Sequence, residues 1–406
     1  MGTDNEIDRR SLIVRTAGAI GAAGTIAGAE VVPASAQAIQ PIPPGFDVQK
    51  PLIENWNKPL NQVVEVDLRK DAPELSDAAA RERHRIYCYL LMKLIHRFWN
   101  GNKRGPLGNY PLRAEQRDLT PLPPALPRYR GDMVDNADGL RINWDRYVGH
   151  NIACLAVDGN GEIIDFDFNH NELFRSSAEH AESRMVRRLF SLTNIFDTWR
   201  TGAPIANKPK AASLNDVTLY TSLESCAQCS GVMSLAGIKQ IVYLQNDFTA
   251  YKIGNIMYNL ANRVDMIDPL GKVTSIPGAP IPIAASEIGL DEFGRLNDSY
   301  LRFATNIVAA GAADPPDLAG AFFIPEHGKP DFDPSITSFL CTDDARTIFA
   351  SGGQKLDGLK LENGTWRSPN KAGDDDVLTN AQSLEQARKF YQYADVEGYR
   401  GSPHKL

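Results

Sequence analysis

Two short motifs in this chain of 406 residues could together hold a catalytic metal ion. The first is His180-Ala181-Glu182, and the second is Cys226-Ala227-Gln228-Cys229. Cysteines at positions i and i+3 project from the same side of a first helical turn, so both sulfurs can reach one ion. With His180 as the third ligand, a zinc ion would keep one position open for water, as catalytic zinc sites do.

Glu182 would stand beside the ion rather than on it, because it follows His180 by two positions. A carboxylate in that place can take a proton from water and deliver it to a leaving amino group. Zinc lowers the pKa of water toward neutrality, and a helix N-terminus makes cysteine thiols easier to ionise. The set therefore favours hydrolysis of a carbon–nitrogen bond.

A lone Cys-x-x-Cys pair also occurs in structural zinc knuckles and in redox pairs. A knuckle would need a second Cys/His pair at comparable spacing, which the sequence lacks, and no thioredoxin-like aromatic flank precedes Cys226. The other cysteines include Cys88 in an apolar helix and Cys154 in an apolar strand, where packed thiols are expected. An odd total of five cysteines argues against a disulfide framework.

The residues around these motifs resemble a known family. The stretch from Leu219 to Met233, Leu-Tyr-Thr-Ser-Leu-Glu-Ser-Cys-Ala-Gln-Cys-Ser-Gly-Val-Met, is followed by Ile-Val-Tyr at 241–243. With His-x-Glu upstream, it resembles the cytidine deaminase-like superfamily, closest to the branch of tRNA adenosine deaminases and guanine deaminases, the CMP/dCMP type. The resemblance covers roughly residues 145–250. It implies that His180, Cys226 and Cys229 bind one Zn²⁺ per chain, that Glu182 is the catalytic residue, and that the protein is a homodimer.

The resemblance also suggests substrate contacts. Asn169 falls where this branch has an asparagine that hydrogen-bonds the base, and Asp247 where many members have an acidic residue. Ala181 and Ser225, beside the metal ligands, complete the predicted substrate-binding set. Asn169 is equally a common turn residue, and Asp247 a common helix N-cap. Ser225 replaces the proline usual in this branch, so we expect a different pocket wall beside the substrate amine.

The hydrophobic pattern predicts an α/β sandwich with a partly parallel sheet, and the resemblance implies a three-layer α-β-α sandwich with a five-stranded mixed sheet. Strands are predicted at 151–157, 162–168, 217–223, 240–245 and 281–285, with a hairpin turn at 158–161. Helices are predicted at 76–99, 179–190, 226–238, 249–263 and 290–310. Beyond them we expect a C-terminal α+β extension with a hairpin at Asn363-Gly364 and a helix near 383–393.

Four regions follow from these elements. Residues 1–38 form a predicted signal peptide, and residues 39–148 a linker, the long helix and an irregular insertion at 100–144. Residues 149–310 form the predicted zinc deaminase domain, and residues 311–406 an extension with no readable chemical role.

The first region has the features of a Tat export signal. Arg9 and Arg10 precede a weakly apolar run that is rich in alanine and glycine, and small residues around Ala36 fit a signal-peptidase site. The run is too short and too glycine-rich for a membrane span. We expect a periplasmic or extracellular protein; unchanged export of an Arg9→Lys, Arg10→Lys variant in cell fractions would argue against the Tat route.

The charge balance bears on the substrate. The chain has 43 Lys and Arg against 50 Asp and Glu, a net charge of −7, which disfavours binding to nucleic acid. The sequence therefore predicts a hydrolase of cyclic amidines that acts on a small nucleobase or nucleoside and releases ammonia. Two alternatives remain: an exported nucleic-acid deaminase toxin, and a non-catalytic zinc-stabilised binding domain in which Glu182 would be dispensable.

Overall fold

The computed structural model describes residues 66–99, 150–171, 176–190, 214–250, 252–262, 265–267, 273–275, 279–316, 322–324, 329–369 and 377–399. The predicted signal peptide and the insertion at 100–144 lie outside these residues. Within the described part of the chain, no helix is long and apolar enough to span a membrane.

A five-stranded mixed sheet forms the centre of the fold, as the sequence predicts. The strand order is β2-β1-β3-β4-β7, with β1 antiparallel to both neighbours and β3, β4 and β7 parallel. The strands are β1 (Ala153–Val157), β2 (Ile163–Phe168), β3 (Thr218–Thr221), β4 (Gln240–Tyr243) and β7 (Ile281–Ala284). Because parallel strands start and end at the same edges, the ends of β3 and β4 bring their following loops together.

The predicted turn between β1 and β2 is held by its own side chain. Oδ1 of Asp158 accepts hydrogen bonds from the backbone N–H groups of Asn160, at 3.0 Å, and Glu162, at 2.8 Å. Gly161 has a φ of +86°, a conformation that glycine adopts without strain. The turn therefore fixes the start of the edge strand β2.

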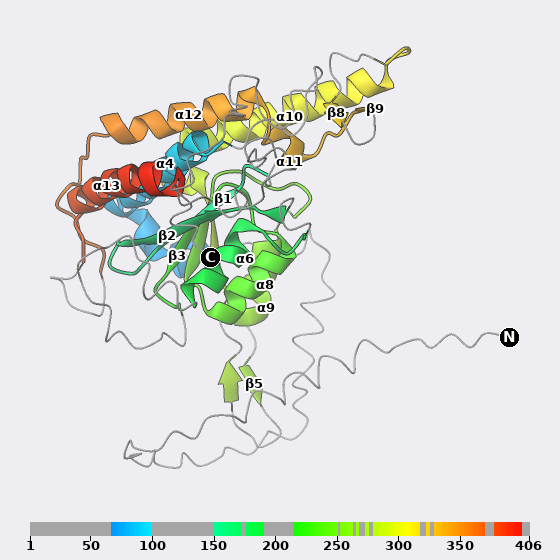
Figure 1. The fold of residues 1–406 in the computed structure, drawn as a ribbon. Helices are drawn as coiled ribbons and strands as arrows, with labels where there is room; N and C mark the ends of the chain where they lie inside the picture. The colour runs from blue at the N-terminus through cyan, green and yellow to red at the C-terminus, as the bar shows by residue number, and fades with distance from the viewer. Residues whose placement is uncertain are drawn as a thin grey trace, which may run out of the picture.

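Helices cover both faces of the sheet and give three layers (Figure 1). One face carries α6 (Ala181–Leu189), α8 (Ala227–Ala236) and α9 (Ile253–Asn262), with α6 packed on β1 and β2 and α9 on β7. The other carries α4 (Ala78–Arg97), which contacts β1 and β3. These helices match the predicted ones to within a few residues at each end, which confirms the predicted α/β class.

Strand β2 attaches α6 to the sheet through buried charges. Arg184 places Nε 3.2 Å from Oδ2 of Asp167 and Nη1 2.6 Å from Oε2 of Glu179. Arg188 forms an ion pair with Asp165. Both aspartates lie on the α6 side of β2, whereas the ring of Phe166 between them packs with aromatic rings at the end of α4 and in α13 (Asn380–Tyr399). This network fixes the first turn of α6, which carries the metal-site residues.

A fourth layer covers the outer side of α4. Figure 1 shows α12 (Asp343–Gly358) and α13 (Asn380–Tyr399) lying over α4, and both helices contact it. Their apolar residues and those of α4 belong to one buried cluster with the sheet. The remaining elements are α10 (Asp291–Ala312), α3 (Leu68–Asp71), η2 (Pro73–Ser76), η6 (Ala285–Ile288), α11 (Ile336–Phe339), β5 (Asp265–Ile267), β6 (Val273–Ser275), β8 (Phe322–Ile324) and β9 (Lys329–Asp331).

The structure differs from the sequence analysis at two places in the C-terminal region. The predicted hairpin at Asn363-Gly364 is a turn without flanking strands. Helix α12 was not expected, because Gly352 and Gly353 interrupt its apolar pattern. These glycines instead allow close approach: a Cβ at Gly353 would lie 2.7 Å from Cα of Lys93, on α4.

Replacing Gly353 by alanine is expected to lower the free energy of unfolding by about 1–3 kcal/mol, because the added methyl group meets backbone atoms of α4. Gly358→Ala on the same helix is the matched control, since a Cβ there would have no neighbour within 4 Å. Urea denaturation of both variants measures the difference. Equal stability of the two would contradict this packing.

Candidate metal centre

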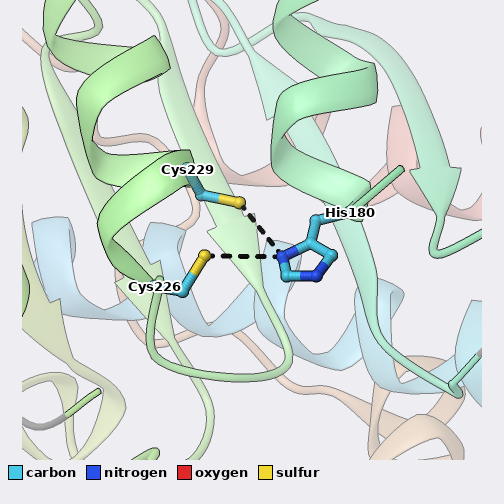
Figure 2. A group of neighbouring side chains, drawn as sticks. All are labelled: His180, Cys226 and Cys229. Atoms are coloured by element: carbon cyan, nitrogen blue, oxygen red, sulfur yellow. Dashed lines mark hydrogen bonds between the residues drawn. The ribbon is translucent and has the colours of Figure 1, made fainter. Parts of the chain in front are cut away.

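The three predicted ligands meet where two helices begin. His180 is the N-cap residue of α6, with φ −77° and ψ 151°, and Cys226 is the N-cap residue of α8, with φ −69° and ψ 173°. Cys229 lies in the first turn of α8. Since α6 and α8 pack side by side, their first turns bring the imidazole and both thiols together (Figure 2).

The distances fit a tetrahedral zinc site. Nδ1 of His180 lies 3.4 Å from Sγ of Cys226 and 3.6 Å from Sγ of Cys229, and the three ligand atoms lie within 4.8 Å of one another. Zinc bonds of about 2.1 Å to nitrogen and about 2.3 Å to sulfur, at a tetrahedral angle, separate the two donors by about 3.6 Å. The side chains therefore need little movement to hold the ion, and Nδ1 is the imidazole nitrogen that faces it.

The local electrostatics favour an ionised sulfur. A hydrogen bond from Cys229, helped by one from His180, lowers the pKa of Cys226 to about 4. The same thiol–thiol hydrogen bond, together with burial, raises the pKa of Cys229. The hydrogen bond to Cys226 raises the pKa of His180. A divalent cation would bind these groups in their deprotonated forms, so metal binding would release protons from the cluster.

Glu182 lies beside this cluster and is buried, with 3% of its surface exposed. Its Oε1 accepts hydrogen bonds from Oγ1 of Thr221 and Oγ of Ser225, both at 3.1 Å. Its Oε2 lies 3.5 Å from Sγ of Cys229. Burial raises the pKa of Glu182 above its ordinary value. One carboxylate oxygen is therefore anchored in the protein, and the other faces the metal ligands.

The four predicted substrate-binding residues are held in three different ways. Asn169 and Ala181 lie together, because Oδ1 of Asn169 accepts a hydrogen bond of 2.7 Å from the backbone N–H of Ala181. Ser225 is buried, and its hydroxyl is directed to Glu182. Asp247 caps its own loop, since its Oδ1 accepts hydrogen bonds from the backbone N–H and the hydroxyl of Thr249, at 2.9 and 2.6 Å.

The structure adds three residues that the sequence analysis missed. Thr221 contacts Glu182, and Oγ of Ser183 lies 3.4 Å from Sγ of Cys229. The Glu224 carboxylate accepts hydrogen bonds from the backbone N–H groups of Asp247, at 3.2 Å, and Lys252, at 3.0 Å. Ser183 and Glu224 adjoin the motifs in sequence, so the sequence could have indicated them as site residues. The role of Thr221 is visible only once β3 is placed against α6.

The remaining cysteines are not part of the cluster. Cys88 and Cys154 are fully buried, as expected of packed thiols, and Cys341 is buried after α11. No disulfide joins any of the five, all of which are described. Burial raises the pKa of the Cys88 and Cys154 thiols, so these groups stay protonated at neutral pH.

Comparison with known proteins agrees with this geometry. Residues 141–245 match the family model for the cytidine and deoxycytidylate deaminase zinc-binding region. This stretch of the chain is therefore similar to the zinc-binding region of that family, and it contains the three clustered side chains that could hold the ion. The match spans about a quarter of the chain: it covers strands β1 to β4 and the metal centre, and it leaves α4, α9, β7 and α10 to α13 outside.

Two further comparisons add less. A solved structure of a tRNA:A34 deaminase, studied for A-to-I editing at the wobble position of transfer RNA, is 18% identical and is matched over 33% of this chain and 82% of that chain. Its TM-score is 0.22, so this likeness indicates nothing about the substrate of the present chain. No protein with a curated description matches.

Proposed function

We propose that this protein is a hydrolytic deaminase with one zinc ion per chain, which converts an amino-purine or amino-pyrimidine base or nucleoside to its oxo form. The observation that carries the proposal is the position of the Glu182 carboxylate. Its Oε2 faces the ligand cluster and lies 3.5 Å from Sγ of Cys229. A purely structural zinc site would have no use for a buried acid at that place. Burying an acid costs free energy, and acids whose pKa is raised by burial beside other titratable groups are typical of functional sites.

The chain's residues divide the reaction between them. Bound zinc would supply a Lewis acid that makes water a nucleophile at neutral pH. Glu182 takes a proton as the oxygen of water bonds to the ring carbon that carries the amino group. It then returns that proton to the departing nitrogen as the carbon–nitrogen bond breaks. The second proton of the water ends on the ring nitrogen of the product, so water and the amino compound give the oxo compound and ammonia, and Glu182 is again a carboxylate.

Base recognition is proposed for Asn169. Its side-chain oxygen already accepts the Ala181 N–H, so the amide orientation is fixed and the –NH₂ group is the part left to donate to an acceptor on the base. Ala181 follows the ligand His180, which places this donor close to the metal centre. Asp247 is a weaker candidate, since Thr249 already engages its Oδ1.

The deciding experiment is an ammonia-release screen of zinc-loaded protein against adenine, guanine, cytosine, their nucleosides and nucleotides. Release from at least one small substrate is expected. Single-stranded DNA and RNA oligonucleotides in the same screen test the toxin alternative. Zinc-loaded protein that releases no ammonia from any of these compounds would leave only the binding-domain alternative. Export by the Tat route stays a sequence-based prediction, since its residues lie outside the described structure.

A further inference from the structure

Two hydroxyl groups converge on one oxygen of the proposed proton carrier. Thr221 is the last residue of β3, and Ser225 directly precedes the ligand Cys226. Both donate to Oε1 of Glu182 at 3.1 Å, and neither donates to Oε2. All three side chains are buried, with exposed fractions of 0% for Thr221, 5% for Ser225 and 3% for Glu182.

We propose that Thr221 and Ser225 are positioning residues, which anchor Oε1 of Glu182 so that Oε2 alone faces the metal centre and carries the proton. The proposal rests on the proposed deaminase function for its catalytic consequence, and on hydrogen-bond geometry for the anchoring itself. Neither hydroxyl is expected to touch the metal ion or the substrate.

The physical reason lies in the freedom of a glutamate side chain. Three rotatable bonds separate its carboxylate from the backbone, and a carboxylate without partners could turn either oxygen toward the ion or bind it directly. Each hydroxyl has one proton to donate, and here both protons go to the same oxygen. Two donors on one oxygen fix both the rotation of the carboxylate and its distance from the ligands, which holds the group ready for proton transfer.

Ser225 also gives a meaning to the departure from the related motif. Proline, usual at this position in the branch that the sequence resembles, has no hydroxyl and cannot donate a hydrogen bond. Serine adds a donor directly before Cys226, and its side chain reaches Glu182. This chain therefore uses position 225 to orient its acid.

Infrared spectroscopy tests the anchoring without any substrate. The difference spectrum between zinc-loaded protein and its Glu182→Gln variant isolates the carboxylate bands of Glu182. These bands are expected to shift in Ser225→Ala and in Thr221→Val, and to stay in place in Ser225→Thr and Thr221→Ser, which keep the hydroxyls. Ser234→Ala is the matched control, because this buried serine of α8 donates its hydroxyl to the backbone oxygen of Ser230, at 2.8 Å.

Kinetics on the best substrate from the screen test the consequence. A hydrogen bond to a charged group contributes enough that each loss should lower kcat about tenfold, and loss of both should lower it further. KM and zinc content should change by less than about twofold, because positioning acts on the transition state rather than on binding. The threonine and serine replacements should recover most of the rate.

The outcomes separate the two proposals. Unshifted bands in both hydroxyl-free variants overturn the anchoring, and a raised KM with unchanged kcat for Ser225→Ala would make Ser225 a substrate contact instead. If wild-type protein releases no ammonia, the proposed function fails, while the infrared bands still decide whether the hydroxyls hold Glu182. Thr221→Val keeps the test decisive if Ser225→Ala does not fold.

Discussion

Replacing Glu182 by glutamine is expected to lower kcat for ammonia release by a factor of about 10²–10⁴ while zinc content stays unchanged. Glutamine keeps the shape of the side chain and an oxygen that can accept from Thr221 and Ser225, but it cannot take up and return a proton. The comparison needs ammonia-release kinetics and zinc analysis on the same preparations.

A suitable control is Glu385→Gln on α13, where an exposed carboxylate pairs with Lys389 at 2.6 Å. That variant should keep full activity. If Glu182→Gln keeps full activity as well, Glu182 is not the proton carrier. If it loses zinc, the carboxylate is a ligand rather than a neighbour of the ion.

Replacing Cys226 by alanine is expected to reduce bound zinc to well below one ion per chain and to abolish deamination. The remaining His180 and Cys229 donors would be a two-ligand set, which holds zinc far less tightly than three. The loss should also appear in unfolding experiments: zinc should raise the melting temperature of the wild type, because it binds the folded state, and should not raise that of Cys226→Ala.

Cys88→Ala is the matched control for this second prediction. The Cys88 thiol is fully buried in α4, on the opposite face of the sheet from the metal centre. Its removal leaves a small cavity and a modest loss of stability, while zinc binding should persist. Undiminished zinc in Cys226→Ala, measured by elemental analysis, would overturn the ligand assignment.

The sequence predicts the sheet and the metal centre well because both rest on local patterns. Strand β1 is a short apolar run that is joined to β2 by a turn with its own side-chain cap, and helices α6 and α8 begin at the motif residues themselves. Two N-cap ligands and one ligand a turn later need only that the two helices start side by side. The superfamily's motif already encodes that arrangement.

The sequence does not predict what depends on contacts between distant segments. Thr221 is an ordinary strand residue until β3 is placed against α6, where its hydroxyl meets Glu182. The sequence does not indicate helix α12, because it contains Gly352 and Gly353, and glycine in a helix interior is unfavourable unless close packing requires it. Only the position of α4 shows that requirement.

Helix α4 lies between the sheet and the C-terminal helices, and this placement has a consequence for how the chain folds. Asn380, at the start of α13, donates hydrogen bonds to the backbone oxygen of Ala79, at 3.0 Å, and to Oε2 of Glu82, at 2.9 Å. These partners are 301 and 298 residues apart in the chain. Contacts of such long range raise the contact order and slow folding. During synthesis, the apolar side of α4 that faces away from the sheet stays uncovered until α12 and α13 have been made. The hydrophobic cluster around α4 is therefore complete only after both helices have left the ribosome.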